Sequence, residues 1–215
     1  TTLIGEKVEH LSVTCPDVTT SFTSSSRQTG SLKLNWKSVS GADGYCIYKK
    51  NNNTGEIYVR KIVEGGSTVS YQDDGLYPGE SQYYRIAAYK ELSGNKVLGD
   101  YTELTTYTIP MYVDGFRVEN KTDKAIRVAW NQIEGIRGYK VERKLSTDSS
   151  YKVIAIVSGS NNLQFVDRNL TSGAKYNYRI RTYKNINGST IYSAYKSITG
   201  STFSQTCLLY TSPSP

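Results

Sequence analysis

The residues best suited to binding chemistry are tyrosines and arginines that alternate with apolar residues. Tyr48 follows Ile47, and Tyr83 and Arg85 stand on either side of Tyr84. Successive residues of a β-strand point to opposite faces of a sheet. If Tyr45 and Ile47 face the core, we expect Cys46 and Tyr48 to face outward. Tyr83 and Arg85 are expected to face outward in the same way, because they alternate with Tyr84 and Ile86. Exposed tyrosine rings could stack on sugar rings. The alternative is that they pair across strands and stabilise the sheet.

A basic stripe is predicted on a second sheet of the same kind. Its residues are Lys140, Glu142, Lys144, Arg179 and Arg181. Such a stripe could bind an anionic polymer, for example a wall teichoic acid, a sulfated glycan or nucleic acid. Nucleic acid is the least expected of these partners, because no aromatic residue is interleaved with the basic ones. The alternative is a solvated face that favours solubility.

No set of residues is arranged for catalysis. His10 is the single histidine, so no nucleophile within residues 16–203 has a histidine base beside it. No Cys/His cluster has zinc-ligand spacing, and we expect no catalytic, cofactor-binding or metal-ligating residue. Asp73 and Asp74 are adjacent and would point to opposite faces of a strand, so a turn role is expected rather than shared acid–base work. The sequence therefore predicts a protein that is not an enzyme.

These segments belong to a unit that the chain contains twice. Trp36 recurs 94 residues later as Trp130, and Tyr45 recurs as Tyr139. Further pairs at this offset are Pro16 and Pro110, Phe22 and Phe116, Gly44 and Gly138, Asp73 and Asp167, Leu76 and Leu170, Gly79 and Gly173, Tyr84 and Tyr178, and Tyr101 and Tyr195. The period predicts two domains, residues 16–109 and 110–206. A specific function is expected where the two copies differ.

Composition excludes several classes of protein. No run approaches the roughly 18 apolar residues of a membrane-spanning helix, so no membrane insertion is expected. The formal net charge of +7 is unevenly placed: residues 16–109 hold ten basic and ten acidic residues, whereas residues 110–203 hold fifteen and seven, a net +8. Cys15, Cys46 and Cys207 have no cysteine counterparts in the other unit, so they do not form a repeated disulfide framework.

Short alternating segments between Gly, Asn, Asp, Ser and Pro turns predict an all-β sandwich for each unit. Leu32, Leu34 and Trp36 alternate with polar residues and are expected to face a core. The last strand of each unit is expected at residues 97–104 and 191–198.

The order of these motifs resembles that of fibronectin type III domains. The motifs are a Trp on the second strand, a Gly-Tyr pair opening the third, and Leu-x-Pro-Gly at 76–79 before the Tyr-Arg-Ile at 84–86. The resemblance implies two tandem seven-stranded immunoglobulin-like sandwiches, each with a tyrosine corner. Tyr176 matches the corner position in the second unit. Gln82 stands there in the first unit, so either the corner is lost or Tyr83 replaces it, and we expect a less stable first unit.

The resemblance extends to arrays of such domains in secreted and surface proteins of Gram-positive bacteria. It implies an extracellular or cell-surface location, no cofactor, and neighbouring domains of the same longer chain as partners. The expected function is that of a non-catalytic spacer or presentation module. The alternative is a module that binds carbohydrate or an anionic cell-wall polymer, as an accessory domain of a secreted hydrolase or adhesin. The join at residues 108–112 has no Gly/Ser-rich spacer, which predicts limited hinge freedom.

The two ends depart from the repeat pattern. Residues 1–15 resemble residues 95–109, so we expect them to be the last strand of a truncated preceding repeat. The final segment CLLYTSPSP resembles the translation of an adapter used in preparing sequencing libraries. Residues 207–215 are therefore expected to be a non-native or disordered tail, with an ordinary Ser/Pro linker as the alternative.

Overall fold

The computed structural model describes residues 16–17, 19 and 21–205. These residues form strands, turns and loops, with no helix among them, and the chain divides into two compact units. The predicted all-β class with two sandwiches is confirmed. The predicted leading strand at residues 1–15 and the predicted tail at residues 207–215 lie outside the described residues, as do His10 and Cys15.

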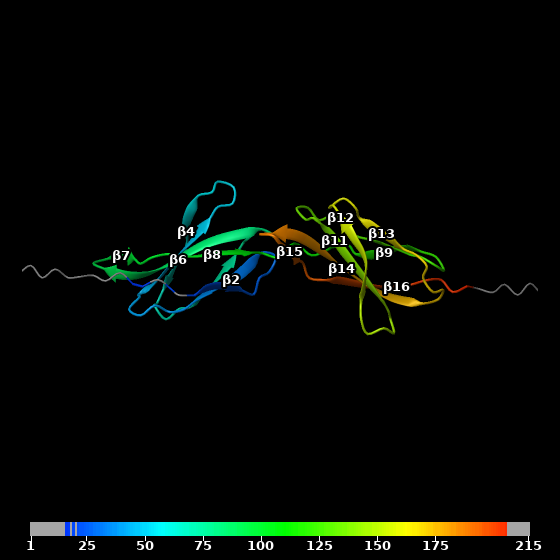
Figure 1. The fold of residues 1–215 in the computed structure, drawn as a ribbon, viewed down its shortest axis with the longest axis horizontal. Coiled ribbons are helices and arrows are strands. Elements are labelled where there is room, and N and C mark those ends of the chain that lie inside the picture. The colour runs from blue at the N-terminus through cyan, green and yellow to red at the C-terminus, as the bar shows by residue number, and fades with distance from the viewer. Residues whose placement is uncertain (1–15, 18, 20, 206–215) are drawn as a thin grey trace, which may run out of the picture. The chain divides into compact units, whose positions relative to one another are not determined.

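The first sandwich consists of two antiparallel sheets (Figure 1). Its strands are β1 (Phe22–Ser25), β2 (Ser31–Trp36), β3 (Gly44–Lys50), β4 (Ile57–Glu64), β5 (Ser70–Asp74), β6 (Ser81–Leu92), β7 (Asn95–Leu98) and β8 (Thr102–Tyr107). One sheet has the order β1-β2-β5. The other has the order β4-β3-β6-β7, and β8 also pairs with β6.

The second sandwich repeats this arrangement. Its strands are β9 (Arg117–Lys121), β10 (Ile126–Ala129), β11 (Gly138–Leu145), β12 (Lys152–Ser158), β13 (Gln164–Asp167), β14 (Lys175–Ile186), β15 (Ser189–Tyr192) and β16 (Lys196–Ser201). The sheet orders are β13-β10-β9 and β12-β11-β14-β15, with β16 pairing with β14. We call β3, β4, β6, β7 and β8, and likewise β11, β12, β14, β15 and β16, the front sheet of each repeat.

Alternation along the strands builds each core. In β2, Leu32, Leu34 and Trp36 are buried and the residues between them are partly exposed. In the second repeat, Trp130 lies 5.1 Å from the ring of Tyr139 and 6.3 Å from that of Phe116. Burial of each such side chain contributes about 1.5–3 kcal/mol, so these residues hold the two sheets together.

The repeated Gly-Tyr pair has a structural role in both repeats. The Tyr45 hydroxyl accepts a hydrogen bond from the Val39 N–H at 2.8 Å and donates to the Gly66 carbonyl at 2.9 Å. The Tyr139 hydroxyl accepts from the Ile133 N–H at 3.1 Å in the same way. A Cβ atom on Gly44 would lie 2.3 Å from the Val63 carbonyl oxygen, which leaves room for glycine alone. The pair therefore belongs to the framework.

The last strand of each repeat is interrupted, which the sequence pattern did not predict. A strand was expected at residues 97–104, but β7 ends at Leu98 and β8 begins at Thr102. Both segments pair with the long strand β6. They are two parts of one broken strand, so each repeat retains the expected set of seven. The break exposes Tyr101 on the front sheet of the first repeat.

The predicted tyrosine corner forms in the second repeat. The Tyr176 hydroxyl accepts a hydrogen bond from the Thr171 N–H at 2.9 Å. In the first repeat Gln82 is buried at the matching position. Tyr83 does not take over this role, because its hydroxyl accepts a hydrogen bond from the Nε of Arg85 instead. The lower stability of the first repeat stays a prediction.

Candidate functional site

The front sheet of the first repeat brings together the three predicted residues Tyr48, Tyr83 and Arg85. Tyr48 on β3 lies opposite Arg85 on β6. Arg85 donates to the Tyr83 hydroxyl at 2.8 Å and to Glu103 at 2.9 Å. The Tyr48 ring meets the Tyr101 ring edge-on, with 5.4 Å between centroids. These contacts engage all three predicted side chains within the sheet.

The charges of this face compensate one another. The hydroxyl of Tyr83 holds the pKa of Glu103 below its usual value, and its hydrogen bond raises the pKa of Arg85. Both charged side chains are well exposed, so solvent screens their attraction. The face thus carries no excess charge from these groups, and whether its tyrosine rings bind a sugar stays a prediction.

Cys46 differs from the expected exposed position. It alternates with Tyr45 and Ile47 as predicted, yet it is 5% exposed. Its register partners, Ile62 on β4 and Ala87 on β6, flank it on the outer face of the sheet. Burial raises the pKa of its thiol, so Cys46 is a free, inert cysteine rather than a reactive group.

The front sheet of the second repeat is organised around a buried carboxylate. Glu142 on β11 is 4% exposed. It accepts hydrogen bonds from Arg179 at 2.6 Å and Tyr195 at 2.9 Å, and its other ion pair is with Lys140 at 3.0 Å. Burial raises the pKa of Glu142, but the hydrogen bonds from Lys140, Arg179 and Tyr195 outweigh this effect and the pKa lies below its usual value. Glu142 is therefore charged at neutral pH.

Two arginines of β14 lie against tyrosine rings on this face. Arg179 and Arg181 are two residues apart on one strand, so both point to the same side. The Arg179 guanidinium carbon lies 4.1 Å from the ring centroid of Tyr151 and 4.0 Å from that of Tyr195. The Arg181 carbon lies 3.8 Å from the centroid of Tyr192 and 4.5 Å from that of Tyr195. We call these five residues the Tyr–Arg ladder.

The structure brings most of the predicted basic stripe together. Lys140 lies opposite Arg181 in the β11–β14 register. The Lys144 ammonium lies 5.3 Å from the ring centroid of Tyr151, which connects Lys144 to the stripe. The same ammonium also donates a hydrogen bond to the Asp148 carbonyl. Whether these residues bind a ligand stays a prediction.

The expectation that no aromatic residue is interleaved with the basic ones is wrong. Tyr151 precedes β12, Tyr192 ends β15, and Tyr195 lies between β15 and β16, so the rings come from strands that flank the predicted stripe. One signal was present in the sequence. Tyr151 and Tyr192 replace Ile57 and Leu98 of the first repeat, and both replacements are differences between the copies.

The repeated aspartates are buried rather than placed at a turn. Asp73 lies in β5, is fully buried, and pairs with Arg60 at 2.6 Å and with the Tyr84 hydroxyl. Asp167 binds Arg143 at 2.7 Å and the Tyr178 hydroxyl at 2.7 Å. The turn role expected for Asp73 is therefore wrong. The recurrence of this carboxylate–tyrosine pair in both repeats marks it as framework.

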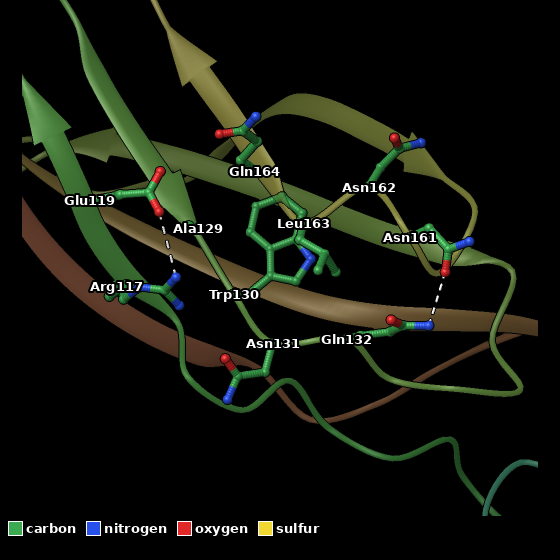
Figure 2. Close-up of a pocket in the computed structure, with 10 residues that line it drawn as sticks. All are labelled: Arg117, Glu119, Ala129, Trp130, Asn131, Gln132, Asn161, Asn162, Leu163 and Gln164. Carbon is green, nitrogen blue, oxygen red and sulfur yellow. Dashed lines mark hydrogen bonds and ion pairs between the residues drawn. The ribbon is translucent and has the colours of Figure 1, made fainter.

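A shallow groove of about 460 Å³ lies beside Trp130 in the second repeat. Figure 2 shows the side-chain amides around it, with Gln132 donating to Asn161 across one end and Arg117 paired with Glu119 at the other. Trp130 is 1% exposed and cannot stack on a ligand. Its indole N–H has no hydrogen-bond partner, but neither has that of Trp36. This feature therefore belongs to the framework and does not mark a ligand site.

Metal binding and membrane insertion were both expected to be absent. Within residues 16–17, 19 and 21–205, no three His, Cys, Asp or Glu side chains are grouped so that they could hold a metal ion. No helix within the same residues is long and apolar enough to cross a membrane.

The paired sheets, the buried Trp and the tyrosine corner define the class of fold, which is that of two tandem fibronectin type III domains. Residues 113–199 match a family model described as fibronectin type III domain, SaeA third domain. A solved structure, a segment of two fibronectin type III domains from chicken tenascin, is 20% identical with a TM-score of 0.56. The match covers 87% of this chain and 99% of that segment, and it supports the fold.

A curated relative is also similar to part of the chain. Contactin-3 of Rattus norvegicus is 28% identical over 138 residues, which is 64% of this chain. The chain spans 13% of the length of that protein. The match therefore concerns one part of a much longer relative, and the role of the whole relative does not transfer to this chain.

Proposed function

We propose that this chain is a non-catalytic part of a longer extracellular or cell-surface protein, in which its repeats space and present neighbouring domains. The observation that carries the proposal is the strand-for-strand repetition. The bounds of β6, β7 and β8 recur in β14, β15 and β16, each 94 residues later. Repeated positions such as Trp36 and Tyr45 are buried framework. Repetition of the framework, with unlike surfaces, supports a spacing role.

A replacement experiment in the longer protein tests this proposal. The two repeats are exchanged for two unrelated β-sandwich domains of the same length, and the activity of the neighbouring domains on their surface target is measured. A spacer predicts that activity is retained, and that deletion of one repeat lowers it because the reach is shortened. Loss of activity after the equal-length exchange would contradict the spacer role and would indicate that these surfaces bind something themselves.

A second candidate function is binding of carbohydrate or of an anionic cell-wall polymer. The Tyr–Arg ladder favours it, because four basic side chains and three tyrosines gather on one sheet face of the second repeat. The full chain is applied to a glycan array and to isolated cell walls. Binding supports this candidate if it requires the folded chain and is lost in the double variant Arg179→Glu with Arg181→Glu. If the chain binds neither the glycan array nor the cell walls, only the spacer role remains.

A further inference from the structure

The Tyr–Arg ladder has one cation that no acidic group balances. Glu142 is within 3.0 Å of Lys140 and within hydrogen-bond distance of Arg179. Within the described residues, the Arg181 side chain has neither an ion pair nor a hydrogen bond, and its buried Nε has no acceptor. The two tyrosine rings beside Arg181 hold its guanidinium in place. Arg181 is thus a positioned cation with unused donors.

The surroundings of Arg181 add further positive charge. Lys140, Lys144, Arg179 and Arg181 contribute four positive charges to the face and Glu142 one negative charge, a net +3. The whole repeat has an excess of eight positive charges. A net positive face of this kind attracts polyanions and loses affinity as salt concentration rises.

The tyrosine rings of the ladder are already occupied by cations. Both arginines lie within 4.5 Å of the Tyr195 centroid. Tyr151 is approached by Arg179 and Lys144, and Tyr192 by Arg181 and Lys140. Sugar rings and nucleic-acid bases both need a free aromatic face on which to stack. The ladder therefore favours recognition of charge over stacking of a neutral sugar or a base.

The first repeat lacks this arrangement. At the positions of Lys140, Glu142 and Arg181 it has Cys46, Tyr48 and Ala87, and only Arg85 matches an arginine of the ladder. Arg85 is paired with Glu103. Arg85 stands at the same strand position as Arg179, but the first repeat has no counterpart of the unbalanced cation Arg181.

We propose that the Tyr–Arg ladder of the second repeat binds a polymer without bases, made of phosphodiesters linked through polyol or sugar units, with the Arg181 guanidinium on a phosphate. The guanidinium has planar donors that fit the oxygens of a phosphate. This inference rests on the second candidate function, and it specifies the chemistry of the ligand. A flexible chain of phosphates can follow Lys140, Arg181 and Lys144 without inserting a ring between the tyrosines.

The test measures binding of the full chain to poly(glycerol phosphate) at several NaCl concentrations. Neutral dextran, sulfated dextran and a thymidine oligonucleotide of equal charge serve as comparison ligands. We expect poly(glycerol phosphate) to bind most tightly and neutral dextran not to bind. Arg181→Gln should weaken binding about three- to tenfold at low salt and should reduce the slope of log affinity against log salt by about 0.7–1.

Two variants guard against a folding artefact. Lys144→Gln removes a partly exposed charge that has no ion pair among the described residues, so it should change the melting temperature little and still weaken binding. Lys124→Gln removes an exposed charge of the second repeat outside its front sheet, and it should leave binding nearly unchanged. Equal binding by wild type and both Arg181→Gln and Lys144→Gln would overturn the proposal. Tighter binding of the sulfated polymer would overturn the phosphate assignment, and tighter binding of the oligonucleotide would overturn the assignment to a polymer without bases. Binding of neutral dextran alone would overturn the proposal and would leave carbohydrate binding as the function.

Discussion

At the scale of single residues, the front sheet of the second repeat depends on the charge of Glu142. Its carboxylate is 5% exposed and contacts three donors. A buried carboxylate without partners is costly, but one with several hydrogen bonds stays ionised. Glu142 therefore sets the positions of Lys140 and Arg179, and through Tyr195 it also orders the ladder.

The lowered pKa of Glu142 predicts a pH dependence. A carboxyl group whose pKa is lower in the folded state stabilises the fold above its unfolded-state pKa, and this contribution is lost as pH falls through the folded-state pKa. The usual value is 4.5, so the contribution of Glu142 should be complete near neutral pH and should decline below about pH 4.5. Glu142→Gln should cost about 1–3 kcal/mol of unfolding free energy at pH 7, measured by urea unfolding.

The comparison of wild type with Glu142→Gln across pH isolates this residue. The difference between them should shrink as pH falls, because the protonated glutamate resembles glutamine. Glu134→Gln, at an exposed turn position, should change the free energy by less than about 0.5 kcal/mol. A difference that stays constant from pH 7 to pH 3 would mean that Glu142 acts through its shape and not through its charge.

At the scale of elements, the two repeats differ at the corner before the sixth strand. The Tyr176 hydroxyl accepts from the Thr171 N–H in the second repeat, and Gln82 replaces that tyrosine in the first. Tyr176→Phe should lower the free energy of unfolding of the second repeat by about 1 kcal/mol, because one hydrogen bond is lost while the ring stays packed. Calorimetry on the full chain measures this as a lower melting temperature for one of two transitions.

Tyr183→Phe is the matched control for the corner. Tyr183 lies on the same strand as Tyr176, and its ring packs 6.2 Å from that of Tyr192. Its replacement should leave the corner intact and shift the transition less than Tyr176→Phe does. Equal shifts would show that the corner hydrogen bond adds no stability of its own.

Strand alternation and the 94-residue period were sufficient to predict the strands and the buried rows, whereas the corner was predicted from the resemblance to fibronectin type III domains. Alternation reports only the face to which a residue points, so it placed Cys46 outward and missed its burial between Ile62 and Ala87 on the neighbouring strands. The break at residues 99–101 was missed because both strand segments continue the same pattern. The ladder was missed because Tyr151 and Tyr195 lie outside the strands that carry the arginines, and packing between strands decides such contacts.

At the scale of the whole molecule, the charge is divided unequally between two copies of one fold. Residues 16–109 are neutral and residues 110–203 carry a net +8, although both build the same sheets. The excess charge is therefore unnecessary for the fold. Like charges on a compact domain repel one another and lower its stability, so the second repeat carries a cost that the first repeat lacks.

This inequality predicts that salt affects the two repeats differently. Raising NaCl from about 10 mM to about 500 mM shortens the screening length from about 30 Å to a few ångströms. The melting temperature of the second repeat should then rise by about 2–5 °C, and that of the neutral first repeat should change little. The Tyr176→Phe variant identifies the transition of the second repeat, since it lowers that transition alone. KCl should act like NaCl, because screening depends on ionic strength. If both transitions shift equally, charge repulsion within the second repeat is negligible. The surplus charge of that repeat then does not lower its stability and matters only for what its surface binds.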